Sequence, residues 1–295
     1  MNAVPVTVVI CTYNRADLLR RCLEALDRQD VPGTAFSVLV VNNRSTDDTS
    51  DVVAAHAAAA PYPLREALEE RQGTSHARNR GILESDTDWV AFLDDDVMPH
   101  PGWMRAVLEF IAEHPEAAVF GGPYLPAYLT PPPAWLPAEI GRIWHGDRVL
   151  RLPWGGCYLA GGNLVSHRRV FEASGLFDPA LGPQGDDYHY GEDTAFYRRA
   201  IAQGLCVYYT PHLVVDHFVR PEKYRLAWHA ASLRELGANL GRRLGGPACL
   251  VAAAGIAALS PLLAAMNFCV FMDVPLKRRV RSEEHTSELQ SRLHL

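Results

Sequence analysis

Three consecutive carboxylates, Asp94-Asp95-Asp96, directly follow the apolar run WVAFL. Like charges so close together raise one another's pKa, so this crowding is costly without a cation. A hard divalent ion relieves the repulsion by taking oxygen ligands from carboxylates and from a substrate phosphate. Because side chains alternate along an extended segment, we expect Asp94 and Asp96 on one side and Asp95 on the other, as one metal ligand plus one ribose contact. The alternative is a solvated acidic turn that caps the helix beginning near Pro101.

A second acidic pair, Glu192-Asp193, lies in the segment GEDT, which opens a helix with an apolar face. Backbone N–H groups at a helix N-terminus favour the carboxylate form, which a general base must have before it accepts a proton. The alternative is a capping pair that only interacts with the helix dipole.

Repeated strand–loop–helix units are predicted to hold these acids. The run VTVVIC (6–11) has the length and β-branched content of a buried strand, and a helical pattern follows it. The same order recurs along the chain, with strands at 36–41, near 64 and at 89–93, and helices at 47–59, 74–83 and 101–113. This alternation predicts an α/β fold with a mostly parallel central sheet and helices on both faces. Ligands bind beyond the carboxyl ends of such strands, at 12–15, 42–48 and 94–96.

Six segments carry a family resemblance: VVICTYNR, VLVVNNRSTDDT, GTSHARNRGI, FLDDDVMP, AGGN and GEDTAF. In this order and spacing they resemble the family-2 glycosyltransferases of GT-A fold, over about Val6 to Arg225. The resemblance implies an enzyme of the hexosyltransferase type. It would move a sugar from a nucleotide-diphosphate donor to a hydroxyl of a glycan or lipid-linked acceptor, with inversion at the anomeric carbon and a divalent metal (Mn or Mg) as cofactor.

The resemblance also assigns residues to the donor site. The residues that would line the nucleotide pocket are Thr12, Tyr13, Asn14 and Arg15. Asn42 or Asn43 would reach the base, with Arg78 nearby.

The acidic residues divide between binding and catalysis in the same way. Asp94 and Asp95 would hold the ribose and the approach to the metal, and Asp96 of this DXD motif would bind the ion. Asp193 matches the catalytic base of the family, with Glu192 beside it.

His217, in VVDHFVRPEK, matches a histidine that in part of the family approaches the metal or the pyrophosphate. A structural histidine at a strand end is the alternative. The chain departs from the family at Asn42, where an acidic residue is usual, and at Arg44, where glycine or a small residue is common. Because a neutral asparagine can still hydrogen-bond a base edge, the choice among uracil, guanine and thymine stays open.

Two rival functions share this fold. A sugar-nucleotide pyrophosphorylase usually has a glycine-rich basic loop after its first strand, and VVICTYNR has none. A catalytically silent binding module could lose Asp96 or Asp193 without harm to its core, so their presence argues against it.

The segment 123–153 departs from the periodic pattern and is rich in proline. Trp135, Trp144 and Trp154 are spaced along and just beyond it, and aromatic faces suit sugar rings, so it is the candidate acceptor loop. The alternative is a proline-rich connection whose tryptophans pack on the core.

Composition sets limits on the class of protein. The chain has 295 residues, of which 48% are apolar and 21% charged, and a net charge of −6, which gives no general reason to bind nucleic acid. Six scattered cysteines without a C-x-x-C pair predict neither a disulfide framework nor a structural zinc site, and no secretory signal is visible, so we expect a cytoplasmic enzyme.

The expected organisation is a GT-A domain at 1–220, with a nucleotide-binding half (1–122) and an acceptor half (123–220), followed by C-terminal helices at 221–280. The last fifteen residues, 281–295, are expected to be a non-native tail, because 281–291 (RSEEHTSELQS) resemble a translated sequencing adapter.

An uncharged stretch, Leu244 to Met272, is long enough to span a bilayer, and arginines precede it. Pro261 would divide it into two short helices. This favours peripheral or interfacial association with the cytoplasmic face of the membrane over a straight span or a soluble protein.

Overall fold

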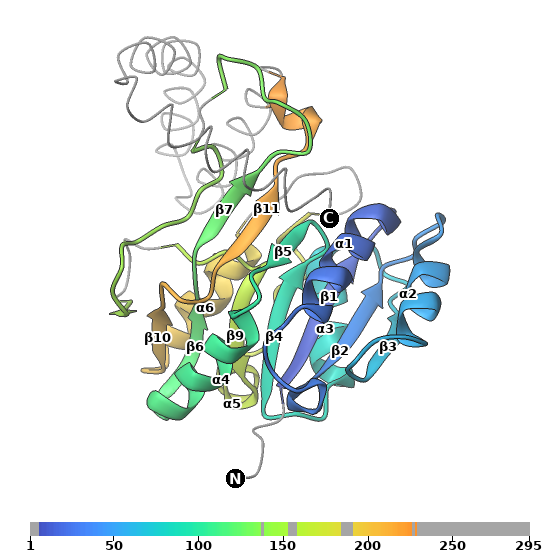
Figure 1. Cartoon of the computed structure of the whole chain (residues 1–295). Coiled ribbons are helices and arrows are strands. Elements are labelled where there is room, and N and C mark those ends of the chain that lie inside the picture. Colours follow the sequence, from blue (N-terminus) through green and yellow to red (C-terminus); the bar gives the residue numbers. More distant parts are fainter. Residues whose placement is uncertain (1–5, 137–138, 153–157, 184–190, 226–227, 229–295) are drawn as a thin grey trace. The chain divides into compact units, whose positions relative to one another are not determined.

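The computed structural model describes residues 6–136, 139–152, 158–183, 191–225 and 228 (Figure 1). The chain divides into two compact units. The first comprises Met1–Leu125, Arg142–Asp187 and Gly191–His217, and the second comprises the remaining segments, Pro126–Gly141, Tyr188–Tyr190 and Phe218–Leu295. The predicted site residues all belong to the first unit.

An eight-stranded sheet forms the centre of the first unit, in the order β3-β2-β1-β4-β9-β6-β10-β8. Its strands are β1 (Val6–Thr12), β2 (Phe36–Asn42), β3 (Leu64–Leu68), β4 (Trp89–Asp94), β6 (Ala117–Gly121), β8 (Leu150–Arg151), β9 (Asn163–His167) and β10 (Cys206–Tyr209). The β3-β2-β1-β4 and β6-β10 pairs are parallel, whereas β9 runs antiparallel to both of its neighbours and β8 runs antiparallel to β10. The predicted mostly parallel sheet is confirmed.

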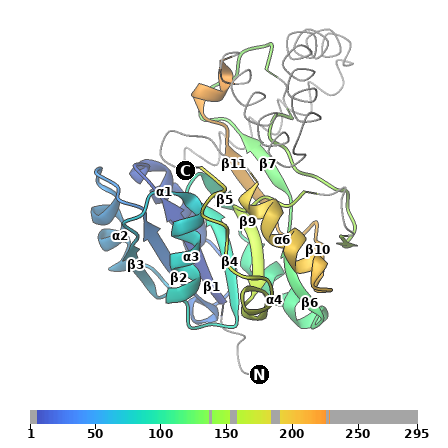
Figure 2. The same ribbon diagram turned by 180° about the vertical axis from the view of Figure 1, so that it is seen from behind.

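Helices cover both faces of the sheet, as predicted (Figures 1 and 2). One face packs against α1 (Ala16–Asp27), α2 (Thr49–Ala57) and α4 (Trp103–Glu113). The other face packs against α3 (Thr74–Glu84), α5 (Arg168–Ser174) and α6 (Glu192–Ala202). Two short 3₁₀ helices, η1 (Gly33–Ala35) and η2 (Pro221–Tyr224), complete the described helices.

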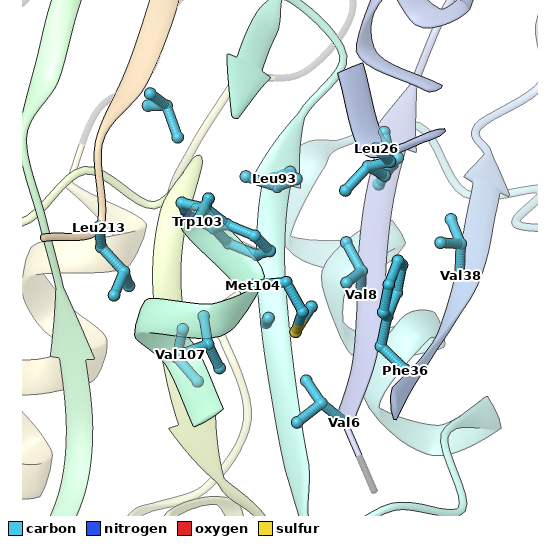
Figure 3. Packing of buried hydrophobic residues seen from close by; sticks show 14 of the residues in the cluster. Val6, Val8, Leu26, Phe36, Val38, Leu93, Trp103, Met104, Val107 and Leu213 are labelled. Atoms are coloured by element: carbon cyan, nitrogen blue, oxygen red, sulfur yellow. The ribbon is translucent and has the colours of Figure 1, made fainter. Parts of the chain in front are cut away.

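The apolar runs of the strands follow from burial on both faces. Along β1, Val6 and Val8 belong to the cluster beneath α1 and α4, whereas Val9 belongs to the cluster on the opposite face. Figure 3 shows Val6 and Val8 among the side chains of neighbouring elements, including Phe36 and Met104. A strand that is buried on both sides needs an apolar residue at almost every position, which is the pattern that VTVVIC displays.

Strand β9 matters most for the site. Because it runs against β4, its first residue lies beside the end of β4, with Asn163 paired to Leu93. The glycines that precede β9 therefore meet the carboxylates that follow Leu93. Asn163 also accepts a hydrogen bond from Trp103 of α4 at 2.9 Å, which fixes this junction in the core.

A second, three-stranded sheet has the order β5-β11-β7 and was not predicted. It consists of β5 (Val97–Pro99), β7 (Tyr124–Ala127) and β11 (Val215–Phe218). Strand β11 is antiparallel to β5, with His217 opposite Val97, the residue after Asp96. This sheet brings the distant His217 to the acidic turn.

Helix starts differ from prediction by two residues in two places. Helix α2 begins at Thr49 instead of residue 47, because the Asp47 carboxylate accepts hydrogen bonds from the backbone of Ala16 and Thr49 and stays in the preceding loop. Helix α4 begins at Trp103 instead of residue 101, after a turn.

Several sequence predictions fall on residues that the structure does not describe. These are most of the C-terminal helices expected at 221–280, the uncharged stretch Leu244 to Met272 within them, the tail 281–295 and Trp154. Within the described residues, no helix combines the length and apolar character that crossing a membrane requires.

Candidate functional site

The triple-aspartate segment is a turn rather than an extended strand. Strand β4 ends at Asp94, and Asp95 and Asp96 form the turn into β5. Arg15 contacts both turn carboxylates, at 2.8 Å from Nη1 to Asp95 Oδ1 and 3.6 Å to Asp96 Oδ2, whereas Asp94 bonds to other residues. Strand alternation applies only up to Asp94, because the turn begins at Asp95. Besides burial, the carboxylates of both Asp94 and Asp96 raise the pKa of the Tyr124 phenol, and the predicted division of roles among the three carboxylates stays a prediction.

Arg15 neutralises part of the charge that this turn concentrates. Burial raises the pKa of Asp95 to about 6, and repulsion from Asp96 adds to the shift, while the Arg15 guanidinium opposes it. Asp95 and Asp96 are both nearly inaccessible to solvent. A further cation beside these carboxylates would favour their ionised form in the same way that Arg15 does.

Arg78 of α3 links the two acidic motifs. Its Nη2 donates to Asp94 Oδ1 at 3.2 Å and its Nη1 donates to Glu192 Oε1 at 2.8 Å. Burial lowers the pKa of Arg78, but Asp94 and Glu192 more than compensate, so its net pKa is raised and it stays a cation. Burial and the neighbouring Asp193 raise the pKa of Glu192, against the effect of Arg78. The other Asp94 oxygen accepts from the Tyr124 hydroxyl at 3.2 Å.

The glycine pair of AGGN packs directly on this ion-pair network. A Cβ atom on Gly161 would lie 2.7 Å from the Arg78 guanidinium, and one on Gly162 would overlap the Asp94 carboxyl group. At AGGN the backbone lies very close to two charged side chains. Only glycine, which has no side chain, fits at these two positions.

Asp193 lies at the first turn of α6 and is buried. Its Oδ2 accepts hydrogen bonds from the Gly161 backbone N–H at 3.0 Å and from the Tyr158 hydroxyl at 2.8 Å. Its Oδ1 accepts from the Thr194 backbone N–H at 2.5 Å and from the Thr194 hydroxyl at 3.3 Å. Hydrogen bonds of this kind stabilise a carboxylate. Gly161, in contact with both Asp193 and Arg78, connects the candidate base to Asp94.

His217 approaches the acidic turn from β11. Its Nε2 lies 3.7 Å from Asp96 Oδ1, its ring stacks on Tyr124 with 4.5 Å between centroids, and its buried Nδ1 has no hydrogen-bond partner among the described residues. One carboxylate and one imidazole facing each other suit a divalent ion that takes its other ligands from a substrate or water. No group of three or more His, Cys, Asp or Glu side chains placed to hold a metal ion occurs in the described part of the chain.

The predicted base-binding asparagines are engaged within the protein. Asn42 donates to Glu66 at 2.9 Å and to Ser50 at 3.2 Å, and its oxygen accepts from the Ser45 backbone. Asn43 ties its loop to the backbone of residues 69–73. Their contact with a base stays a prediction.

The loops after β1 and β2 are also bonded to each other. Thr12 is buried at the end of β1, and its carbonyl accepts from the Asn43 backbone. Asn14 accepts from the Thr46 backbone at 2.7 Å. Tyr13, by contrast, is 38% exposed, so its side chain is accessible to a ligand at this edge of the sheet.

Sequence reasoning missed Tyr124 and Tyr158. Both tyrosines donate to an acidic residue of the site, yet neither lies in a recognisable motif. The signal for Tyr158 is its place three residues before Gly161, on the segment that carries the glycine pair. Of the predicted acceptor tryptophans, Trp144 is 39% exposed beneath Arg142, and Trp154 lies outside the described residues.

Comparisons with known proteins agree with this arrangement. The sequence profile of Glycosyl transferase family 2 matches residues 7–175. Glycosyltransferase AglE of Haloferax volcanii is 40% identical over 102 residues, which are 34% of this chain and 33% of that protein. The glucosyl-dolichyl phosphate glucuronosyltransferase of the same organism is 25% identical over 76% of this chain and 72% of its own length. The succinoglycan biosynthesis protein ExoM of Rhizobium meliloti is 27% identical over 81% of this chain and 75% of its own length. This chain therefore spans about a third of AglE and about three quarters of the other two.

Solved structures share the fold. The mannosyltransferase PcManGT from Pyrobaculum calidifontis, in complex with GDP-Man and Mn²⁺, has a TM-score of 0.60 and 20% identity, over 94% of this chain and 83% of that chain. TarS 1–349 of S. aureus, in complex with UDP, has a TM-score of 0.55 and 18% identity, over 79% of this chain and 64% of that chain.

Proposed function

The chain belongs to glycosyl transferase family 2 and is a glycosyltransferase, and from this premise we propose that it transfers a sugar, with inversion, from a nucleotide-diphosphate donor to an acceptor hydroxyl. One observation carries the proposal. Asp193, the candidate base, is joined through Gly161 and the buried Arg78 to Asp94, the last residue of β4 and the first of the three aspartates. The two acidic motifs therefore belong to one site.

Asp193 acts as the general base in this proposal. It takes the proton of the acceptor hydroxyl while the acceptor oxygen attacks the anomeric carbon from the side opposite the diphosphate. The bond from the anomeric carbon to the phosphate oxygen breaks, and the nucleoside diphosphate leaves with the electron pair. Attack opposite the leaving group inverts the anomeric configuration. Glu192 is committed to Arg78, so its role is to hold that cation beside Asp94.

The donor is assigned to the edge formed by the ends of β1, β2 and β4. Thr12, Tyr13, Asn14 and Arg15 follow β1, and Asp94 and Asp95 follow β4. Solved structures of similar fold hold UDP, UDP-GlcNAc or GDP-Man, which supports a donor of this class. In the proposed division, residues 1–122 bind the nucleotide, 123–220 bind the acceptor, and 221–280 form a separate C-terminal part.

The residues Asp96 and His217 would hold the divalent ion, Mn²⁺ or Mg²⁺. Their carboxylate and imidazole face each other at 3.7 Å, and His217 Nδ1 has no hydrogen-bond partner in the part of the chain that the structure describes. Both observations fit a ligand pair better than an isolated structural histidine. When bound, such an ion stabilises negative charge on a departing diphosphate.

The acceptor is proposed to be a glycan or a lipid-linked sugar. Two similar proteins are named for dolichyl phosphate and succinoglycan chemistry, and both fit an enzyme of polysaccharide biosynthesis. We place the enzyme at the cytoplasmic face of the membrane on the strength of the uncharged stretch 244–272 and the arginines before it. Cell fractionation tests this placement, and recovery in the soluble fraction at low salt would contradict it.

The test of the function begins with the donor. UDP, GDP and TDP are each added with manganese, and the nucleotide that raises the melting temperature identifies the donor class. Asp193→Asn should then lower transfer by roughly 10²–10⁴-fold, because an amide cannot accept the proton. The variant should bind the nucleotide diphosphate as the wild type does, since the proposed donor edge lies at the ends of β1, β2 and β4. Retention of most of the wild-type transfer rate would exclude Asp193 as the base.

A further inference from the structure

Hydrogen-bond donors within the protein already occupy both oxygens of the Asp193 carboxylate. A carboxylate offers about four lone-pair positions. Tyr158 and Gly161 donate to Oδ2, and the backbone N–H and hydroxyl of Thr194 donate to Oδ1. An acceptor hydroxyl that gives its proton to Asp193 must therefore replace one of these donors.

The hydrogen-bond donors differ in how easily an acceptor hydroxyl can displace them from Asp193. The Gly161 N–H belongs to backbone that packs against the Arg78 guanidinium, and the Thr194 N–H belongs to the first turn of α6. Two donors are hydroxyls that can rotate away from Asp193. The Thr194 hydroxyl, at 3.3 Å from Oδ1, belongs to a partly buried residue in the first turn of α6. The Tyr158 hydroxyl belongs to a residue that is 44% exposed, so it is the donor that a ligand arriving from solvent meets first. Rotation about its side-chain bonds moves the phenol without moving the main chain.

The backbone of Tyr158 is held separately from its side chain. Its carbonyl oxygen lies 2.7 Å from His145 Nε2, and the His145 ring packs edge-on against Tyr209, with 5.0 Å between centroids. The exposed fraction describes the whole residue, whereas the hydroxyl end lies against Asp193. Loss of hydration at this end and the nearby Asp193 carboxylate raise the pKa of the Tyr158 phenol well above its usual value, so the group at Asp193 is a neutral O–H. A neutral hydroxyl at 2.8 Å is the chemical equivalent of an acceptor hydroxyl in contact with the base.

We propose that the Tyr158 hydroxyl occupies the acceptor-hydroxyl position on Asp193 until an acceptor displaces it, and that it thereby keeps water from using this base to hydrolyse the donor. The inference rests on the proposed function and adds a role for a residue outside the motifs. Tyr158 is a positioning residue here, because it acts through Asp193 and takes no part in bond making.

The reaction that Tyr158 suppresses is the transfer of the sugar to water. A water proton moves to Asp193, the water oxygen bonds to the anomeric carbon, and the bond to the phosphate oxygen breaks. The nucleoside diphosphate departs with the electron pair, and the sugar is released free. Transfer to an acceptor differs from hydrolysis only in the hydroxyl that gives its proton to Asp193. If water could reach this base freely, the enzyme would hydrolyse the nucleotide sugar without transferring the sugar.

The experiment measures release of nucleoside diphosphate without an acceptor, from the nucleotide sugar of the donor class identified by melting temperature. Tyr158→Phe removes only the hydroxyl. It should raise this hydrolysis about tenfold, the factor expected when one hydrogen bond to a charged group is lost. Tyr158→Phe combined with Asp193→Asn should return hydrolysis to the background, which shows that the gain runs through the base.

Tyr208→Phe is the matched control. Its phenol also donates to a carboxylate, Glu116 Oε1, at 2.7 Å, but Tyr208 lies on β10 and is not one of the predicted site residues. Hydrolysis by this variant should equal that of the wild type. A general loosening of the fold lowers activity, so a gain confined to Tyr158→Phe is not a structural side effect.

The outcomes separate this inference from the proposed function. If the wild type binds a nucleotide diphosphate and transfers sugar with dependence on Asp193, but Tyr158→Phe leaves hydrolysis unchanged or lower, the inference alone is overturned. If neither protein binds any nucleotide diphosphate, the proposed function fails and the inference falls with it.

Discussion

Neighbouring residues of the site differ in their tasks because they differ in their partners. Glu192 and Asp193 are adjacent in sequence, and both are buried. Glu192 faces the permanent cation Arg78, whereas Asp193 faces neutral hydroxyl and N–H donors. Glu192 is therefore held in an ion pair with Arg78, whereas Asp193 is bonded to neutral groups, one of which an acceptor hydroxyl can replace.

Arg44 provides a test at the residue scale that is independent of catalysis. Its φ is +64°, in the left-handed region, and the other described non-glycine residue there is Asn14, whose type tolerates this conformation. Arg44→Gly should raise the free energy of unfolding by about 0.5 kcal/mol, because glycine removes the steric cost of the left-handed backbone. Urea denaturation measures this change.

The control for Arg44→Gly is the same substitution in a helix. Arg20 lies within α1 and is exposed, so Arg20→Gly should lower the free energy of unfolding by about 1 kcal/mol. Loss of stability in both variants would contradict the explanation of Arg44. The sequence alone shows that Arg44 replaces the small residue common in the family. It does not show the positive φ that explains why a small residue is usual at this position.

At the scale of elements, the glycines before β9 make a testable junction. Gly162→Ala should destabilise the protein by about 1–3 kcal/mol, because the new methyl group overlaps the Asp94 carboxyl in a packed interior. It should also weaken binding of the nucleotide diphosphate by displacing Asp94. Thermal denaturation and calorimetry measure the two effects.

Gly102→Ala is the matched control for Gly162→Ala. Gly102 has an ordinary negative φ, and an added Cβ there meets the flexible end of Arg105 at 2.9 Å. A loss of stability of no more than about 1 kcal/mol is expected, because this side chain can move aside and the remaining cost is the poorer N-cap that alanine gives α4. Equal destabilisation of the two variants would contradict the close-approach explanation.

Element prediction succeeded where the chain carries a long periodic signal. The apolar runs of β1, β2 and β4 and the helix patterns of α1 and α3 were predicted to within one or two residues. The three-stranded sheet was missed because β5, with three residues, and β7 and β11, with four each, are too short for a period to show. The antiparallel direction of β9 was missed because strand direction depends on pairing partners that a single segment does not reveal.

The sequence indicated the acidic residues of the candidate site, but not the contacts that they make. A triple aspartate and an acidic pair at a helix start are visible in sequence as residue types. The contact of Arg15 with Asp95, and that of Arg78 with Glu192, depend on tertiary structure. Residue type therefore predicted which groups could do chemistry, and only the fold could say which of them meet.

For the protein as a unit, we expect folding to be independent of metal. The Arg15 guanidinium already offsets part of the charge of Asp95 and Asp96. Adding a chelator to the protein without nucleotide should therefore leave the melting temperature unchanged. A large drop would mean that the fold itself needs an ion.

Metal should matter once the donor binds. With manganese, nucleotide-diphosphate binding should be tighter in the wild type than in Asp96→Ala, and a chelator should remove the difference, because the proposed ion joins this carboxylate to the phosphates. Isothermal calorimetry decides between the outcomes. Equal affinity with manganese, with chelator and in the variant would exclude the metal role of Asp96.

The order of the elements along the chain sets the time at which the parts of the site are made during synthesis. Strands β1 to β4 lie within the first 94 residues, and they pair with one another, so they can assemble as soon as they leave the ribosome. The glycines that cover Asp94 and the helix that carries Asp193 are translated later. In the nascent chain the donor-side carboxylates are therefore made first, Gly162 becomes available to cover Asp94 next, and the candidate base Asp193 joins them only when α6 has been translated.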